Sequence, residues 1–274
     1  MANSASVTGD YYTRFSGIAR LYSAQGLERL RRSHVCVIGV GGVGSWAVEA
    51  LARSGIGEIT MIDLDEVCTS NVNRQLPALS NNIGRAKIEV MEERIHGINP
   101  DAKIHSLLTF FTESKSRELL ATRFDYVIDA IDGVRNKALL IALCRELRIP
   151  VITMGGAGGR RDPTQVQIVD LALSSHDRLL LATRTELRKH HGFPKGPNTL
   201  FGVDCVMSKE AQVFPAQDGA VCDQPLERGN LRLNCESGYG TATFVTGAFG
   251  FAAAGAVVKS IAVSPGAVLN QKVV

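Results

Sequence analysis

A chain of 274 residues is long enough for one large domain or two small ones, and 45% apolar with 21% charged residues is typical of a globular protein. These values exclude a disordered or fibrous chain, and a net charge of +3 is too small to indicate nucleic-acid binding by itself. The six cysteines form no C-x-x-C pair, which excludes a zinc ribbon and disfavours a disulfide scaffold. We therefore expect a protein of the reducing cytoplasm.

Strands and helices alternate over the first part of the chain. The apolar, β-branched run His34–Gly39 predicts a strand, and a glycine turn, a helix over Ser45–Ser54 and a strand over Glu58–Asp63 follow it. This order predicts a βαβ unit with a right-handed crossover. The further elements expected before the glycine-rich turn Gly155–Gly159 are two helices, Lys87–Ile98 and Lys137–Leu147, and three strands, Lys103–Leu108, Asp125–Asp129 and Pro150–Thr153. The fold class predicted is α/β, with a doubly wound, mainly parallel, Rossmann-like sheet.

The rhythm changes at Arg160, beyond which Gln165–Asp170 predicts an antiparallel strand and Leu200–Cys235 is broken into short strands or loops. Nothing resembles a flexible linker, so we predict one domain over residues 1–274 with an elaborated C-terminal third. Its parts are an N-terminal arm and helix (1–33), a nucleotide-binding core (34–159) and a C-terminal elaboration with substrate loops and a small-residue helix (160–274).

One uncharged stretch of 22 residues, 237–258, is long enough to cross a bilayer. Five of its residues are Gly and six are Ala, and it contains neither Leu nor Ile. Small residues let helix backbones approach closely, which suits a helix over Gly238–Val258 in a core or subunit interface as well as one in a membrane. Because the hydropathy is low for a span, we expect no membrane, and a span stays the minor alternative.

A glycine turn follows the first predicted strand. Its sequence, GVGGVG, satisfies G-x-G-x-x-G with Gly39, Gly41, Gly42 and Gly44. Such glycines allow a tight turn and close backbone approach, and the next helix presents unpaired N–H groups to a phosphate. Asp63 stands at the end of the next strand, where an acidic residue binds a ribose. The pattern predicts nucleotide binding without separating a dinucleotide from ATP, and a turn kept only for packing is the alternative.

Two cations are expected beside this turn: Arg74, within Ser70–Gln75 (SNVNRQ), and Lys87, which opens a helix. A triphosphate carries enough charge to need both groups, whereas the pyrophosphate of a dinucleotide does not. Asp129 and Asp132 stand at and just beyond a strand end on the ligand side, and Asp132 is the candidate Mg²⁺ ligand. For each cation taken singly, an exposed salt bridge is the alternative.

Together, G-x-G-G-x-G, D-x-D, S-N-x-x-R-Q, G-x-x-K and D-x-x-D resemble the adenylating domain of the ubiquitin-activating superfamily, which includes bacterial activators of sulfur-carrier proteins. The resemblance runs from about Tyr12 to Gly159. It implies a homodimer in which an N-terminal arginine reaches the partner's ATP; Arg14 in YYTRF matches best, and Arg20 is the second candidate. It also implies roles for the motif residues. The motif glycines bind the nucleotide and Asp63 binds its ribose. The side chains that approach the triphosphate are Asn71, Arg74, Gln75 and Lys87, and Asp132 binds Mg²⁺.

Two features depart from the carrier-protein activators: the paired zinc cysteines are absent, and Gly133 replaces the asparagine that often follows the magnesium aspartate. Beyond Gly159, the segments GGAGGRRDPTQVQIVDL, FGVDCVMSKE and NCESGYGTATFVTGAFGF resemble the tRNA threonylcarbamoyladenosine dehydratase branch. This resemblance covers nearly the whole chain. It implies ATP-dependent ring closure of threonylcarbamoyladenosine beside the anticodon of tRNA, through carboxylate activation.

Several alternatives stay open from the sequence. They are an acyl-phosphate instead of an adenylate intermediate, an activator of a ubiquitin-like sulfur-carrier protein, a nicotinamide-dependent oxidoreductase, and a non-catalytic scaffold or sulfur-relay partner. A monovalent cation and a cysteine desulfurase that hands over sulfur are further open possibilities for cofactor and partner.

Two cysteines near glycine turns, Cys205 and Cys235, are candidates for a covalent role, but ring closure within a substrate needs no enzyme nucleophile. Burial is the commoner fate of a cysteine. The segment His176–Lys195 carries an excess of positive charge. A solvated helix face and a contact to tRNA phosphates explain that excess equally well.

Overall fold

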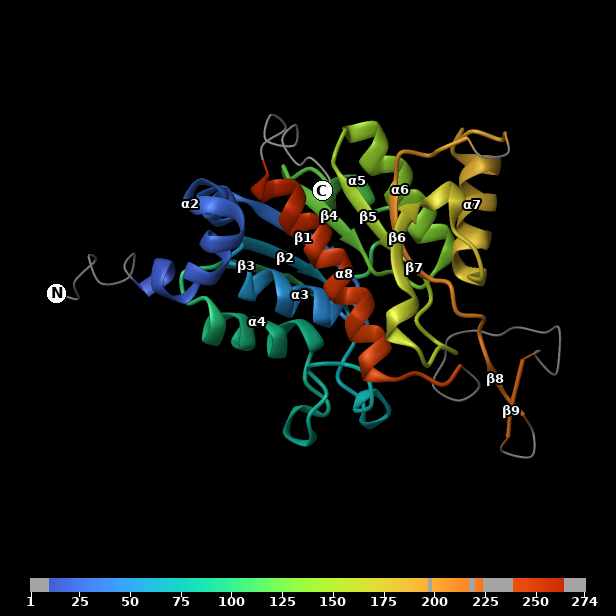
Figure 1. Ribbon diagram of the computed structural model, residues 1–274, viewed down its shortest axis with the longest axis horizontal. Helices are drawn as coiled ribbons and strands as arrows, with labels where there is room; N and C mark the ends of the chain where they lie inside the picture. The colour runs from blue at the N-terminus through green and yellow to red at the C-terminus, as the bar shows by residue number, and fades with distance from the viewer. Residues whose placement is uncertain (1–9, 197–198, 217–219, 224–238, 264–274) are drawn as a thin grey trace, which may run out of the picture.

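The computed structural model describes residues 10–196, 199–216, 220–223 and 239–263. Their centre is a seven-stranded sheet of order β3-β2-β1-β4-β5-β7-β6, in which only the pairing of β6 with β7 is antiparallel (Figure 1). The predicted doubly wound, mainly parallel α/β fold is confirmed. The strands are β1 (His34–Ile38), β2 (Glu58–Ile62), β3 (Lys103–Leu107), β4 (Tyr126–Asp129), β5 (Val151–Met154), β6 (Val166–Asp170) and β7 (Asp204–Ser208), with a separate pair β8 (Phe214–Pro215) and β9 (Val221–Cys222).

Helices cover both faces of the sheet (Figure 1). One apolar core joins the sheet to α3, α4 and α8, and two others join its opposite face to α5, α6 and α7. The helices are α2 (Ser16–Arg32), α3 (Gly44–Arg53), α4 (Lys87–Ile98), α5 (Ser116–Leu119), α6 (Val134–Leu147), α7 (Arg178–His190) and α8 (Thr243–Ala262), with short turns η1 (Thr69–Asn71), η2 (Ser80–Asn82), η3 (Pro163–Gln165) and η4 (Leu171–Leu173).

The turn between β1 and α3 requires two of its glycines. Gly39 has φ +90°, and a Cβ there would lie 2.7 Å from the carbonyl oxygen of Ala130. A Cβ on Gly44 would lie 1.8 Å from the carbonyl oxygen of Gly39. The glycine pattern is therefore needed for the close approach of β1, α3 and the loop after β4, independently of any ligand.

The small-residue stretch forms α8, which begins at Thr243 and extends to Ala262 instead of ending at Val258. By length and composition alone α8 could cross a membrane, but half of its apolar window is buried. It packs across α3 and also touches α2 and the sheet. At Gly250 a Cβ would lie only 2.5 Å from the carbonyl oxygen of Val43. The small side chains thus serve helix contact within the fold, as expected for a core helix.

One other boundary differs from the sequence expectation. Helix α6 begins at Val134, three residues before the predicted Lys137, because Lys137 is a buried residue within the helix and not its start. In the C-terminal third, β6 and β7 extend the same sheet beyond β5. Cys235, one of the two candidate cysteines, lies outside the described residues.

Candidate active site

A cavity of about 1010 Å³ opens at the carboxyl ends of the central strands. The strand order reverses between β1 and β4, and the loops after these two strands diverge to leave a crevice, as in other open α/β sheets. The cavity brings together most of the residues that the sequence predicts for a site, from segments far apart in the chain. They are Gly39, Gly41, Gly42, Asp63, Asn71, Arg74, Gln75, Lys87 and Asp132. Gly44 is not in the lining and belongs to the packed start of α3.

Asp63, at the end of β2, connects that strand to the glycine turn. Its carboxylate accepts the N–H of Val40 at 2.6 Å and that of Asp65 at 2.8 Å. Burial raises the pKa of Asp63 above its ordinary value, while these two N–H groups act in the opposite direction. Asp63 therefore holds the shape of the turn as well as lining the cavity, and its predicted contact to a ribose remains a prediction.

Arg74 follows η1, and its backbone is fixed by two helices. Its carbonyl oxygen accepts the indole N–H of Trp46 on α3 at 3.0 Å and the hydroxyl of Thr246 on α8 at 3.3 Å. Its guanidinium donates to the carbonyl oxygen of Ser70 at 2.7 Å and to the side chain of Asn73 at 3.1 Å. This cation is held at the cavity wall by a preformed loop.

The two amides of the same segment differ in function. Asn71 is buried, and its Oδ1 accepts the N–H of Cys68 at 3.1 Å, so it caps η1. Gln75 is also buried, but its Oε1 has no hydrogen-bond partner within the part of the chain that the structure describes. A buried unpaired carbonyl is costly, and an N–H or O–H group of a ligand in the cavity would satisfy it.

Lys87 opens α4 and points its ammonium group to the cavity rim. Nζ lies 2.8 Å from Oδ2 of Asp65, and the lysine side chain is 5% exposed while that of Asp65 is 54% exposed. Because Asp65 is well solvated, an anionic ligand can share this cation without leaving a buried charge unpaired.

The aspartate that ends β4 and the one three residues beyond it have different environments. Asp129 is completely buried, and its Oδ2 accepts from Lys137 Nζ at 2.9 Å and from the hydroxyl of Thr153 at 2.7 Å. Its Oδ1 accepts the N–H of Ile131 at 3.0 Å. Asp132 instead is exposed in the cavity and has no hydrogen-bond or ion-pair partner among the described residues. One available carboxylate next to a phosphate site suits Mg²⁺, which takes one or two protein oxygens and keeps several waters.

Further residues of the cavity wall were not predicted. A glycine-rich turn after β5 supplies part of the wall, and the chain before α8 supplies another. The glycines after β5 could have predicted this part of the wall, because the carboxyl ends of parallel strands lie at one edge of the sheet. These additional lining residues include Phe110, Phe111, Asn136, Gly155, Gly156, Gly158, Tyr239, Gly240, Thr241 and Thr246.

Arg14 does not reach the cavity of its own chain. Its guanidinium donates to Asp10 at 2.6 Å and to the carbonyl oxygen of Ile98 at 3.4 Å. Ile98 is the last residue of α4, and the helix separates it from Lys87 by about 16.5 Å, eleven steps at 1.5 Å per residue. Arg20 is exposed and is likewise absent from the cavity wall.

The buried Cys205 lies in the core between β7 and the helices α6 and α7. Burial raises the pKa of its thiol well above the ordinary value, so little nucleophilic thiolate is present at neutral pH. A thiol in this environment has the properties of a core residue.

The positive segment around α7 is not a uniformly solvated face. Arg188 donates to the carbonyl oxygen of Pro194 at 3.0 Å and lies over the Phe201 ring, and Arg184 donates to Ser174. These arginines close off the α7 core. The cations of the segment that remain exposed are Arg178, Lys189 and Lys195.

The comparisons with known proteins match nearly the whole chain. The model of the ThiF family matches residues 13–267. The chain is 49% identical to the tRNA threonylcarbamoyladenosine dehydratase of Escherichia coli over 90% of its own length and 93% of that protein. It is 48% identical to the protein of the same name from Haemophilus influenzae, over 92% and 94%.

The solved structures that resemble this chain include the same class of protein. The crystal structure of the E. coli tRNA N6-threonylcarbamoyladenosine dehydratase in complex with ATP has a TM-score of 0.83 at 45% identity, covering 93% of this chain and 96% of that one. A structure of that protein in complex with AMP matches equally well, with a TM-score of 0.83. The chain therefore belongs to the ThiF family, within the ubiquitin-activating-like adenylating superfamily that its motifs resemble.

Proposed function

We propose that the protein is an ATP-dependent tRNA threonylcarbamoyladenosine dehydratase. One observation carries this function: the full-length match is to dehydratases, one of which has been solved with ATP and with AMP, and this chain has a cavity with the matching chemistry. The carrier-protein activators, the main alternative, usually hold structural zinc with C-x-x-C pairs, which this sequence lacks.

The reaction begins with attack of the threonyl carboxylate on the α-phosphorus of ATP, which releases pyrophosphate and leaves an acyl-adenylate. Arg74 and Lys87 neutralise negative charge that develops on the phosphates, and the N–H groups of the glycine turn bind the phosphate oxygens. Mg²⁺ at Asp132 supplies further neutralisation of the phosphates when bound. The carbamoyl group of the same nucleoside then attacks the activated carbonyl, AMP leaves, and the ring closes.

The intramolecular second step explains why no enzyme nucleophile is needed. The carbamoyl group and the acyl carbon belong to one substrate, and holding them at contact distance replaces a bimolecular encounter. The buried Cys205 thiol is consistent with a reaction that forms no bond to the protein.

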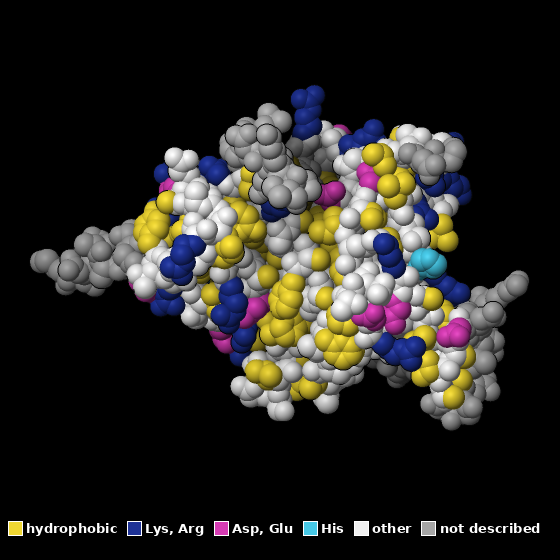
Figure 2. Space-filling view, viewed as in Figure 1, with side chains coloured by type: hydrophobic (Ala, Val, Ile, Leu, Met, Phe, Trp, Pro, Cys, Tyr) yellow, Lys and Arg dark blue, Asp and Glu magenta, His cyan; other side chains and the backbone are white. Residues whose placement is uncertain are grey.

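We propose a homodimer in which Arg14 completes the partner's site. In its own chain, Arg14 lies at the far end of α4 from the cavity, so it can act on ATP only in another subunit. Figure 2 shows hydrophobic side chains gathered along α8, where Phe244 and Phe251 are 57% and 50% exposed. Such an apolar strip suits contact between subunits.

The remaining assignments are the tRNA surface and the compartment. The exposed cations Arg178, Lys189 and Lys195 around α7 are the proposed contact to tRNA phosphates. A cytoplasmic location is supported by the free thiols of Cys36, Cys68, Cys144 and Cys205, because such thiols persist in a reducing compartment.

The test is incubation of threonylcarbamoyladenosine-containing tRNA with the enzyme, ATP and Mg²⁺, followed by nucleoside mass measurement. The expected product is lighter by one water and forms together with AMP and pyrophosphate. An unchanged nucleoside mass contradicts the proposal, and ADP in place of AMP establishes an acyl-phosphate route. Pyrophosphate exchange stimulated by a Gly-Gly-ending carrier protein and not by the tRNA would favour the carrier activator.

A further inference from the structure

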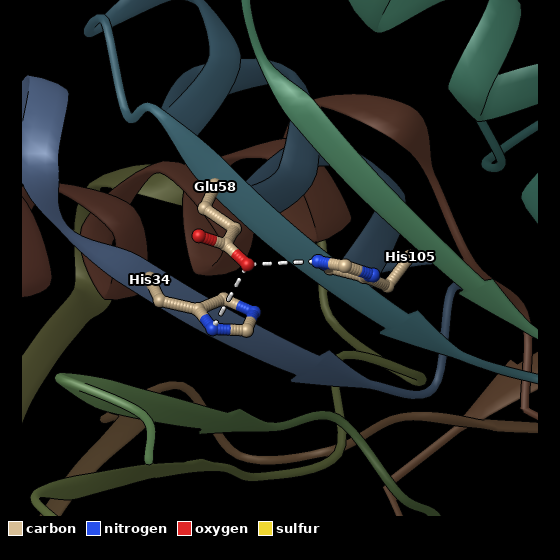
Figure 3. Close-up of side chains that lie close together, drawn as sticks. All are labelled: His34, Glu58 and His105. Atoms are coloured by element: carbon tan, nitrogen blue, oxygen red, sulfur yellow. Dashed lines mark hydrogen bonds and ion pairs between the residues drawn. The ribbon is translucent and has the colours of Figure 1, made fainter. Parts of the chain in front are cut away.

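Three side chains with metal-binding chemistry converge on the sheet, away from the cavity. They are His34 on β1, Glu58 on β2 and His105 on β3 (Figure 3). His34 is in register with Glu58, and Thr60 is in register with His105. Since aligned residues and alternate residues of neighbouring strands share a face, all three side chains project to the same side. That side is opposite to the α3 and α4 core, and both His34 and Glu58 begin their strands, at the edge far from the cavity.

The donor atoms lie close enough for one ion. Oε1 of Glu58 is 2.8 Å from Nε2 of His105 and 3.5 Å from Nδ1 of His34, and the donor atoms all lie within 4.8 Å of one another. Two ligand atoms around Zn²⁺ are about 3–4 Å apart, given metal–ligand distances of about 2.0–2.2 Å. The side chains are 11%, 29% and 47% exposed in chain order, so a small rotation of the exposed His105 ring is enough to close the site.

The ring of His34 is oriented for coordination. Its Nε2 lies 2.8 Å from the hydroxyl oxygen of Thr60, and the Phe124 ring packs edge-on against it at 4.8 Å. With Nε2–H donating to Thr60, the lone pair of Nδ1 points to Glu58. A metal-bound histidine is generally held by such a hydrogen bond from its other ring nitrogen, which fixes the tautomer.

The charges around the three side chains favour the binding of a cation overall. Glu58 contributes one negative charge, and Asp125 contributes a second close by, where its carboxylate accepts the backbone N–H of His34 at 2.8 Å. Lys103 on β3 is in register with Glu58 on β2 and contributes one positive charge. With both histidines neutral, the cluster has a net charge of −1, and its exposed side leaves room for a water ligand.

We propose that His34, Glu58 and His105 form a binding site for a divalent transition-metal ion of the Zn²⁺ class, with water as the fourth ligand. Two imidazole nitrogens and one carboxylate oxygen form a donor set that Zn²⁺ accepts readily and that Mg²⁺ and Ca²⁺ do not favour. The bound ion ties the edge strand β3 to β2 and β1, and it is separate from the Mg²⁺ of the nucleotide cavity.

The test is competition for Zn²⁺ against a chromophoric chelator, using untagged protein that carries Cys68→Ser to remove an exposed thiol. One Zn²⁺ per chain is expected, together with a rise in melting temperature. His105→Ala and Glu58→Gln should each weaken this binding by about 100-fold or more, and Thr60→Val by about 10–100-fold, as expected for a residue that holds a ligand.

Two controls separate the site from general metal binding. His190 and Glu186 on α7 form a His–Glu pair at 3.9 Å that belongs to no three-ligand group in the described ranges, so His190→Ala should leave Zn²⁺ affinity unchanged. ATP affinity of His105→Ala in Mg²⁺ should equal that of the parent. Absence of Zn²⁺ binding by the parent, or equal affinity in the parent, His105→Ala and Glu58→Gln, would overturn the proposal.

Discussion

Lys137 Nζ lies 2.9 Å from Asp129 Oδ2, and both side chains are completely inaccessible to solvent. Asp129 also holds the N–H of Ile131, so this buried pair fixes the loop that presents Asp132 to the cavity. The first prediction is that Lys137→Met lowers the free energy of unfolding by about 3–5 kcal/mol, because it leaves a buried carboxylate without its counter-charge.

Urea denaturation of Lys137→Met, Asp129→Asn and the double variant measures this coupling. The double variant should lose clearly less than the sum of the single losses, since it removes both charges together. Additive losses, or a single loss below about 0.5 kcal/mol, would show that the pair contributes no such coupling.

The second prediction concerns Asp132, whose carboxylate has no partner in the described part of the chain. Asp132→Asn should leave stability and nucleotide affinity nearly unchanged while turnover falls at least about 100-fold, because electrostatic groups at reacting phosphates act mainly on the transition state. Calorimetric ATP binding and nucleoside mass measurement give the two quantities. The control is Asp101→Asn, an exposed aspartate away from the cavity. Equal losses of binding and turnover would assign Asp132 to nucleotide binding alone.

The alternation of the first 150 residues is a local pattern, which is why the sequence predicts it well. The apolar run at His34–Ile38 and the glycine turn after it specify β1 and the start of α3 within a few residues. The shared edge of the parallel strands then places Asp63, Arg74 and Asp132 around one cavity. The parallel character of the sheet and the position of these loops thus follow from short-range signals and a handedness rule.

Other features depend on contacts that no local pattern reveals. Thr246 reaches the carbonyl oxygen of Arg74, 172 residues away, only because α8 crosses α3. Asp129 and Asp132 are only three positions apart, yet Asp129 pairs with the buried Lys137 and therefore has a structural role. From the sequence, Arg184 belongs to a charged segment that is expected to face solvent or tRNA. In the structure its guanidinium donates a hydrogen bond to Ser174 instead. Each of these depends on tertiary packing.

The third prediction tests the packing of α8 with two glycines on one helix. A Cβ at Gly250 would lie 2.5 Å from the backbone of Val43, so Gly250→Ala must push α8 away from α3, at a cost of about 1–3 kcal/mol. Gly255 faces open space, so Gly255→Ala should stabilise the helix by about 0.5–1 kcal/mol. Thermal and urea unfolding of both variants check the opposite signs, and the same sign in both would contradict this account.

The fourth prediction is that Cys205→Ala leaves turnover of the folded enzyme within about two-fold of the parent, because the thiol is buried and its raised pKa leaves it protonated. Some stability, about 1 kcal/mol, should be lost with the removed core volume. Turnover is measured per folded chain, with the fraction folded taken from circular dichroism. A loss above about 100-fold would reinstate a covalent intermediate.

The last prediction concerns Arg14 and the dimer. Arg14 forms an exposed ion pair with Asp10, and such pairs contribute less than about 1 kcal/mol, so Arg14→Ala should fold and assemble normally. Its turnover should nevertheless fall severely, because the partner's triphosphate loses a cation supplied from the neighbouring subunit, as arginine fingers supply one in other phosphate chemistry. Arg20 is an exposed arginine on α2 and the second candidate for this role, so Arg20→Ala tests between the two and should retain activity if Arg14 is the residue involved.

Mixing Arg14→Ala with Arg74→Ala distinguishes a contribution from the partner from one within the same chain. A mixed dimer contains one site in which Arg74 of one chain meets Arg14 of the other, both intact. With random exchange of equal amounts, half of the dimers are mixed and one of their two sites works, so about a quarter of wild-type activity should return. Differently tagged chains establish that exchange has occurred. If exchange is complete and no activity returns, Arg14 does not act on the partner's ATP, and the loss in Arg14→Ala must arise within its own chain.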